Sequence, residues 1–215
     1  MAMAYESPLT IADVVRDISN NKYVLPSIQR EFVWSASQIE RLFDSIMQDY
    51  PIGAFLFWEL STGQNTLYDF YSFLQNYHEK NATHNPKINL KGSENVMAVL
   101  DGQQRLTSIY IGLKGTYAYK IPFKQWKSEA AFPERKLYLN IVEPSNSEND
   151  RYDFSFLTVD EVINDADHYW FEVGNILEMT ELGDVMNFLM QNIAFSGVYT
   201  KEQSVFANGT LSQLF

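Results

Sequence analysis

The sequence contains no cysteine, so disulfide bonds and thiolate chemistry are excluded, and the chain fits a reducing compartment. Its histidines, His78, His84 and His168, are scattered along the chain and leave little room for a structural zinc site. No stretch approaches the roughly 18 consecutive apolar residues of a membrane span, and the first residues lack a basic segment followed by an apolar one. We therefore expect a cytoplasmic protein that makes no use of a membrane.

Basic residues are also scarce. Lysine and arginine number 16 against 27 acidic residues, which gives a formal net charge of -11 at pH 7. A charge of this sign repels a polyanion at long range. Any contact with nucleic acid is therefore expected to be local, bridged by a metal ion, or made by another domain.

Apolar residues are plentiful. The chain has 215 residues, of which 46% are hydrophobic and 15% aromatic, so it can bury a sizeable core. Apolar residues recur at helical spacing in several segments, and the first two such segments follow good N-caps, Thr10 and Ser35 or Ser37. We expect helices over residues 11–19, 35–50, 66–80, 104–115 and 176–193.

Short apolar runs rich in β-branched and aromatic residues lie between these helices. Residues 22–28 contain Pro26, which favours an edge strand or an extended segment. Residues 54–60 and 95–100 suit buried strands, residues 136–142 and 168–173 suit further strands, and residues 143–153 have the composition of a loop. The pattern predicts one mixed α/β domain with a more helical C-terminal part.

The stretch DGQQRLTS, which starts at Asp101, joins a predicted strand to a predicted helix. Such a junction aims the free amides of the first helical turn at one spot, and that spot attracts an anion. Gly102 allows close approach, and Gln103, Gln104 and Arg105 add donors suited to phosphate oxygens. The ionised Asp101 side chain can only accept hydrogen bonds, so it suits a magnesium ion or a ribose hydroxyl. The motif alone is equally compatible with an ordinary turn in which Asp101 caps the helix and Arg105 is solvated.

A second glutamine-arginine pair, Gln29-Arg30, lies at another junction between an extended segment and a helix. We expect the two pairs to converge on one ligand, although Arg30 could instead pair with Asp44 or Asp101. Aromatic side chains near this junction are expected in the core. Trp34, next to the pair, is the exception that we retain as a candidate base or sugar contact.

Glu40 and Asp44 lie four residues apart on the predicted helix over residues 35–50. Two carboxylates at this spacing could hold a metal ion from one helix face. More often such a pair is a solvated surface, and we expect the solvated surface here.

Residues Leu25 to Trp58 and Val99 to Leu113 together resemble the N-terminal domain of the GmrSD-type restriction endonucleases, a family of the ParB/sulfiredoxin-like superfamily. The family's DGQQR motif matches from Asp101 to Arg105 and its QR motif matches Gln29-Arg30. The resemblance implies an α/β (α+β) domain of the ParB/sulfiredoxin-like kind, with a small mixed sheet, flanking helices and a helical C-terminal extension. One departure is that the family's N-x-G-G-T-x-L-S segment has only a compressed counterpart at residues 208–212.

The resemblance also implies a nucleoside triphosphate as ligand, with Mg²⁺ or another divalent metal as cofactor, and hydrolysis of that nucleotide. Asp101 and Arg105 would be the catalytic residues, and Asp101 would also hold the metal. The nucleotide-binding residues would be Gln29, Arg30, Gly102, Gln103, Gln104, Arg105 and Thr107.

In full-length members of this family, such a domain precedes an HNH-type nuclease domain. We expect residues 1–195 to form the nucleotide-binding domain and residues 196–215 to be a tail of uncertain structure, with the HNH domain absent from this chain. DNA would be reached through that missing domain or a partner subunit, in a type IV-like system that cleaves modified foreign DNA. Two alternatives remain open: a sensor of modified DNA without NTPase activity, and a protein-interaction module. Homo-oligomerisation also stays open.

Overall fold

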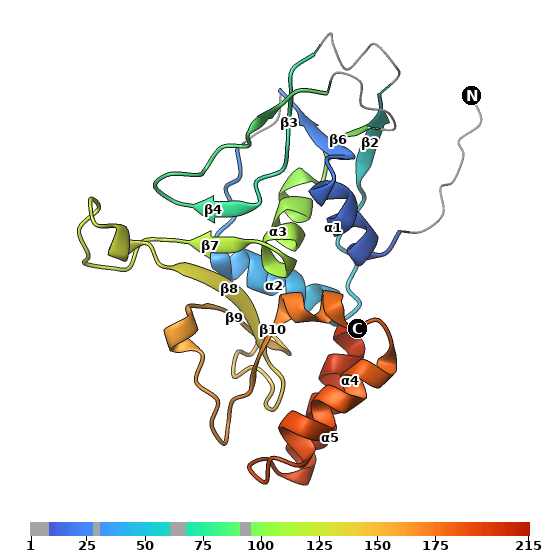
Figure 1. The fold of residues 1–215 in the computed structure, drawn as a ribbon, viewed down its shortest axis with the longest axis vertical. Coiled ribbons are helices and arrows are strands. Elements are labelled where there is room, and N and C mark those ends of the chain that lie inside the picture. The colour runs from blue at the N-terminus through green and yellow to red at the C-terminus, as the bar shows by residue number, and fades with distance from the viewer. Residues whose placement is uncertain (1–8, 28–30, 61–67, 91–95) are drawn as a thin grey trace.

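The computed structural model describes residues 9–27, 31–60, 68–90 and 96–215. It confirms the mixed α/β class and the helical C-terminal part, with two small mixed sheets in the described residues (Figure 1). The assignment to the ParB/sulfiredoxin-like superfamily stays a prediction. The α-helices are α1 (Ile11–Ser19), α2 (Ala36–Met47), α3 (Gln103–Leu113), α4 (Leu182–Leu189) and α5 (Lys201–Leu214).

The first sheet has the strand order β2-β6-β1-β3-β5. β1 and β6 run parallel, and the other neighbours are antiparallel. The strands are β1 (Tyr23–Pro26), β2 (Leu56–Glu59), β3 (Phe70–Tyr71), β5 (Lys87–Ile88) and β6 (Met97–Asp101).

Two predictions for this sheet are wrong. β1, expected at an edge, lies inside the sheet and is buried along its whole length. The sheet tolerates Pro26 because the proline is the last residue of the strand, where a missing N–H interrupts the ladder least. β2, expected to be buried, is the edge strand, and all of its residues are at least partly exposed.

The second sheet has the order β10-β8-β7-β4, with β9 paired to β8. β4 and β7 are parallel and the other pairs are antiparallel. Its strands are β4 (Asn76–His78), β7 (Thr116–Ala118), β8 (Glu134–Asn140), β9 (Asp153–Leu157) and β10 (Trp170–Glu172). β9 follows the predicted loop and was not expected.

The helix predicted over residues 66–80 is wrong. Within its described part, β3 joins the first sheet and β4 joins the second, so the segment connects the two. Phe70, Phe73 and Leu74 are all buried, as expected for apolar side chains, but they are not buried in the same cluster. Phe70 packs in a smaller cluster on the first sheet, whereas Phe73 and Leu74 belong to the main core. The helical spacing therefore reflects burial at two places rather than one helix face.

Helices α1, α2 and α3 lie between the first sheet and the second (Figure 1). The predicted caps are present: the Thr10 side chain accepts a hydrogen bond from the Asp13 amide, and Ser35 forms a capping box with Gln38. α3 also crosses α2 closely. A Cβ at Gly112 would overlap the ring of Phe43, so this glycine sets how near the two helices come.

After β7 the described chain contains four short helical segments besides the α-helices α4 and α5. The 3-10 helices are η2 (Glu129–Ala131), η3 (Val159–Glu161) and η4 (Val173–Glu178), and α4 continues into one π-helical turn, η5 (Met190–Ala194). α5 lies within the predicted tail, yet its Ala207 and Leu211 are completely buried in the main core. The boundary at residue 195 stays a prediction. None of the helices in the described ranges is long and apolar enough to cross a membrane.

Candidate functional site

The turn between β6 and α3 is built on Gly102. Its backbone is left-handed, with φ 89° and ψ 5°, and α3 begins at the next residue. A Cβ at this position would overlap the ring of Phe55, with only 2.8 Å to Cε1, and would lie 3.3 Å from Nη2 of Arg105. Glycine is therefore required both by the backbone conformation and by the close packing above the turn.

Arg105 is the third residue of α3, and its guanidinium reaches across to the segment before β2. Nη1 donates to the carbonyl of Ile52, and Nη2 donates to the carbonyl of Ala54 at 2.8 Å. The guanidinium also lies over the Phe55 ring, 4.7 Å from its centroid. Gly53 makes room for it, since a Cβ there would lie 2.6 Å from Nη1. Arg105 thus fixes residues 52–55 beside the glycine turn.

Gln104 connects the same turn to the segment that follows the second motif. Its Nε2 donates to the carbonyl of Glu31 at 2.8 Å, and its Oε1 accepts from the amide of Val33 at 3.1 Å. Gln29 and Arg30 themselves lie outside the described residues, but Glu31 follows Arg30 directly in the sequence. The Gln104 side chain therefore holds the chain just after the Gln-Arg pair against the start of α3.

The other two nucleotide-binding candidates on α3 point into the protein. Thr107 is 3% exposed and Gln103 is 9% exposed. Among the described residues, the buried Oε1 of Gln103 finds no hydrogen-bond donor, and neither does the hydroxyl of Ser108. Buried polar atoms are satisfied in the great majority of cases, so these two are among the few exceptions in the described residues.

Asp101 is the exposed member of the motif. Its side chain is 72% exposed, against 20% for Arg105, and its Oδ2 lies 3.7 Å from Nη2 of Arg105. The described residues contain no group of three or more acidic, histidine or cysteine side chains that could hold a metal ion. Mg²⁺ often binds through one or two carboxylates plus substrate phosphates, and a single exposed carboxylate beside a helix N-terminus fits that mode.

Trp34 is half-buried and packs against the main core. Its carbonyl accepts a hydrogen bond of 2.9 Å from the hydroxyl of Tyr117 on β7. Tyr117 in turn stacks on Tyr77 of β4 with ring centroids 4.5 Å apart, and Phe32 meets the same Tyr77 edge-on. These contacts place Trp34 in the connection between the α3 turn and the second sheet, and its role as a base or sugar contact stays a prediction.

The carboxylates of Glu40 and Asp44 are not a solvated surface pair. Asp44 is 4% exposed, and its Oδ1 accepts from the amides of Arg151 and Tyr152 at 3.0 and 2.9 Å. The Oε1 of Glu40 accepts from the amide of Phe156 at 3.0 Å. Both carboxylates bind backbone amides around β9, so the expectation of a solvated helix face was wrong.

The residues that sequence reasoning missed are those of the segment PIGAF before β2. Ile52 and Ala54 bind the Arg105 guanidinium through their carbonyls, and the ring of Phe55 packs against it. A signal was present: Gly53 lies only two residues before an aromatic side chain, within the block that resembles the family. The sequence pattern could not predict that this glycine faces Arg105, more than fifty positions further along the chain.

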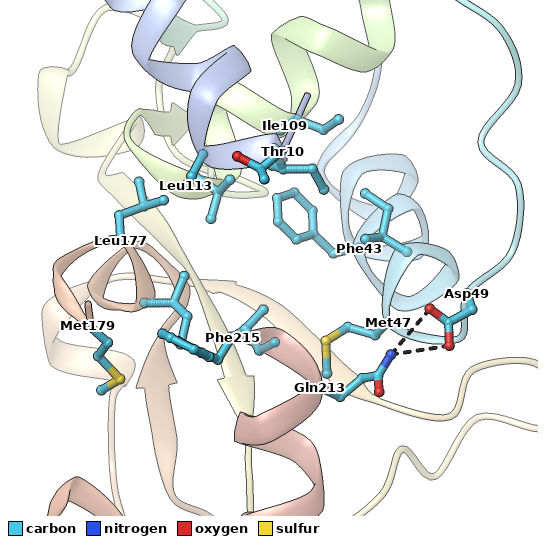
Figure 2. Close-up of a pocket in the computed structure, with 15 residues that line it drawn as sticks. Thr10, Phe43, Met47, Asp49, Ile109, Leu113, Leu177, Met179, Gln213 and Phe215 are labelled. Atoms are coloured by element: carbon cyan, nitrogen blue, oxygen red, sulfur yellow. Dashed lines mark hydrogen bonds between the residues drawn. The ribbon is translucent and has the colours of Figure 1, made fainter. Parts of the chain in front are cut away.

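A separate apolar pocket of about 390 Å³ lies where α1, α2, α3, η4 and the end of α5 meet (Figure 2). Phe43, Leu113, Leu177 and Phe215 contribute its apolar walls. At its rim Gln213 donates to the carboxylate of Asp49 at 3.3 Å. None of the predicted nucleotide or metal residues lines this pocket, so it is distinct from the α3 turn.

The fold and site together define a mixed α/β module with a glycine turn and clustered polar side chains at the start of a central helix. The model of one protein family, described as "GmrSD restriction endonuclease, N-terminal domain", matches residues 11–204. The chain belongs to this family and is therefore a module related to restriction endonucleases and anti-phage defence.

A relative was found in the archaeon Methanocaldococcus jannaschii, where it is described as "Uncharacterized protein MJ0686". It is 32% identical over 122 residues, which cover 57% of this chain and 19% of the relative. The chain thus spans about a fifth of that protein's length.

Proposed function

We propose that this domain binds a nucleoside triphosphate together with Mg²⁺ or another divalent metal and hydrolyses it. The nucleotide state then controls DNA cleavage by an HNH-type nuclease domain, carried by the same protein or by a partner subunit. The cleaved DNA is modified foreign DNA, as in type IV-like restriction. The family match supports the restriction role, and the geometry of the α3 turn supports the nucleotide site.

One observation carries the nucleotide proposal: Gln104 tethers the segment directly after Gln29-Arg30 to the first turn of α3. The segment that directly follows one motif is thereby held beside the other motif, about seventy residues further along the chain. A helix N-terminus of an 11-residue helix adds its positive dipole end at the same place.

Each residue has a role in this proposal. The first amides of α3 face the phosphates, since a glycine turn at Gly102 lets the ligand approach the backbone closely. Asp101 would hold the metal ion, which would supply positive charge to the phosphate oxygens. Gln104 and Gln29 position the nucleotide through hydrogen bonds, and Thr107 supports the turn from the protein interior. Arg30 supplies a guanidinium for the phosphates.

Arg105 combines two tasks. A guanidinium has five N–H donors, so its bonds to the carbonyls of Ile52 and Ala54 leave donors for a phosphate oxygen. Holding the arginine between two carbonyls also fixes its position before the ligand arrives. Such preorganised charge is the form in which electrostatic stabilisation of a phosphoryl transition state is most effective.

The experiment measures binding of each nucleoside triphosphate by calorimetry, with and without Mg²⁺, and phosphate release from the same samples. The wild-type chain should bind one of them in a Mg²⁺-dependent manner. Asp101→Asn should remove the Mg²⁺ dependence, whereas the control Asp160→Asn, an exposed aspartate in η3, should not. Arg30→Ala should weaken binding at least about tenfold, as expected for a lost charge-assisted contact.

The arginine control is Arg16→Ala, since Arg16 lies on α1 with its side chain 63% exposed. It should bind nucleotide as the wild type does. Binding of no triphosphate by the folded wild type, or equal binding by Arg30→Ala, Asp101→Asn and both controls, would remove the nucleotide proposal and leave only the restriction-related module.

A further inference from the structure

The connection between β7 and β8, residues 120–130, projects away from the body of the protein (Figure 1). We refer to it as the β7–β8 loop. It carries Lys120, Lys124 and Lys127 and contains no acidic residue before Glu129. Within the described residues, none of these lysines forms an ion pair, since Glu129 pairs with Lys80. In a chain with a net charge of -11, the loop is thus a local concentration of unpaired positive charge.

The same loop exposes two aromatic rings. Phe123 is 104% exposed, as fully as in an extended peptide, and Trp126 is 50% exposed. Phe123 also has a left-handed backbone with φ 66°, which is uncommon for a bulky residue. At this exposure no contact within the chain buries the Phe123 ring, and Lys124 follows it directly in the sequence.

The loop is held in place although its tip is exposed. The Ile121 amide donates to the carbonyl of Ala131 at 2.7 Å and closes the base of the loop. The ring of Trp126 meets that of the buried Phe132 edge-on, with centroids 5.1 Å apart. A contact surface presented on an anchored loop loses little entropy on binding, so Phe123 is placed for a partner outside the chain.

We propose that the β7–β8 loop is a DNA-binding element of this domain. Lys124 and Lys127 contact backbone phosphates of a DNA duplex, and Phe123 inserts as an apolar wedge against a base step. The charge pattern favours a polyanion, because three lysines lie close together in one loop of a chain whose net charge is -11. The choice of DNA as the polyanion rests on the restriction role proposed above. Nucleotide binding at α3 is not required for it.

The test uses the whole chain and a fluorescently labelled DNA duplex of about two helical turns, with binding followed by anisotropy at low salt, about 50 mM. Phe123→Ala should weaken binding roughly tenfold, the scale of one lost aromatic–base contact. Lys127→Glu should weaken it and reduce the slope of log K against log salt by about one.

Matched controls exist for both changes. Phe195 is another exposed phenylalanine, 73% exposed, and Lys201 is another exposed lysine, at the start of α5. Phe195→Ala and Lys201→Glu change hydrophobicity and charge by the same amounts at other places. They should leave DNA binding within about twofold of the wild type, the ordinary scatter of surface substitutions.

Three outcomes would overturn the proposal: no duplex binding by the wild type, equal loss in the loop variants and their controls, or binding of anionic phospholipid vesicles but not DNA through the same residues. Calorimetric nucleotide binding by Phe123→Ala and Lys127→Glu separates this test from that of the α3 site. Both variants should bind triphosphate as the wild type does, so failure of one proposal leaves the other standing.

Discussion

At the scale of single residues, Gly102 and Arg105 show how a short motif serves the fold before it serves a ligand. Gly102 combines a left-handed backbone with a contact that leaves no room for a Cβ. The requirement for glycine could be predicted from a strand-to-helix junction. Its packing against Phe55 could not, because Phe55 lies on another strand connection nearly fifty residues away.

Gly102→Ala should destabilise the protein by about 2 kcal/mol or more, since a left-handed alanine is strained and its methyl group overlaps Phe55. The matched control is Gly209→Ala. Gly209 is in α5 with nothing within 4 Å of an added Cβ, so this change should stabilise the protein by about 0.5–1 kcal/mol. Urea denaturation of both variants measures the change in the free energy of unfolding, which should be negative for Gly102→Ala and positive for Gly209→Ala. A neutral Gly102→Ala would show that the turn relaxes freely.

Arg105 was predicted to face phosphate, and in the structure two of its donors bind the carbonyls of Ile52 and Ala54. Arg105→Ala should therefore lower the free energy of unfolding by about 2 kcal/mol, because two charged hydrogen bonds, one of them partly buried, and the contact with Phe55 are lost. Arg16→Ala, which breaks an exposed ion pair on α1, should cost less than about 1 kcal/mol. Equal urea midpoints for the two variants would mean that the Arg105 bonds contribute nothing.

At the scale of elements, α2 is joined to β9 by carboxylates that bind backbone amides. Asp44 accepts from the amides of Arg151 and Tyr152, and Glu40 accepts from that of Phe156. The spacing of the two acids on one helix face was visible in the sequence. Their partners lie more than a hundred residues further on, so no local pattern could distinguish this arrangement from a solvated surface.

Burial raises the pKa of Glu40 above its ordinary value of 4.5, and the nearby charges of Asp153 and Asp150 raise it further, while the bond from Phe156 opposes them. A folded pKa above the unfolded one means that this group stabilises the fold below the ordinary pKa and loses that stabilisation as pH rises through the folded pKa. Burial also raises the pKa of Asp153 above its ordinary value.

Glu40→Gln keeps the oxygen that accepts from Phe156 and removes the charge. It should be more stable than the wild type at pH 7, by on the order of 1 kcal/mol or less, and the gain should vanish near pH 4. Glu148→Gln removes an exposed charge from the loop before β9 and should show no such pH dependence. Urea unfolding at both pH values measures the difference. A Glu40→Gln variant that is less stable at pH 7 would show that the carboxylate charge itself is needed.

The fold could be predicted where local signals decide it. Caps and helical spacing predicted α1 and α2, and continuous apolar runs predicted β6 and β8. The segment over residues 66–80 was misassigned because its aromatic residues are buried in two different clusters, which mimics one helix face. For the site, the sequence identified the residues of the α3 turn, but the bonds from Gln104 to Glu31 and Val33 depend on chain packing that no motif encodes.

At the scale of the whole molecule, one core joins the two sheets. The main cluster contains Leu25 and Val99 from the first sheet, Leu139 and Phe171 from the second, and Leu211 from α5. A second, smaller cluster covers only the first sheet. Because the helices between the sheets bury side chains against both, neither sheet retains a complete core without the other. We therefore expect one cooperative unfolding unit rather than two.

Hydrogen exchange read by mass spectrometry in increasing urea tests this cooperativity in the unmodified chain. Peptides covering β6 and β8 should lose protection with the same dependence on urea. Leu139→Ala then provides the decisive perturbation, since Leu139 is completely buried in the second sheet and its truncation should cost about 3 kcal/mol. If the core is shared, protection of β6 falls by the same free energy as that of β8, although the substitution is in the other sheet. If β6 kept its protection while β8 lost it, the sheets would be separate units, and a signal from nucleotide at the α3 turn could not reach the β7–β8 loop through a common core.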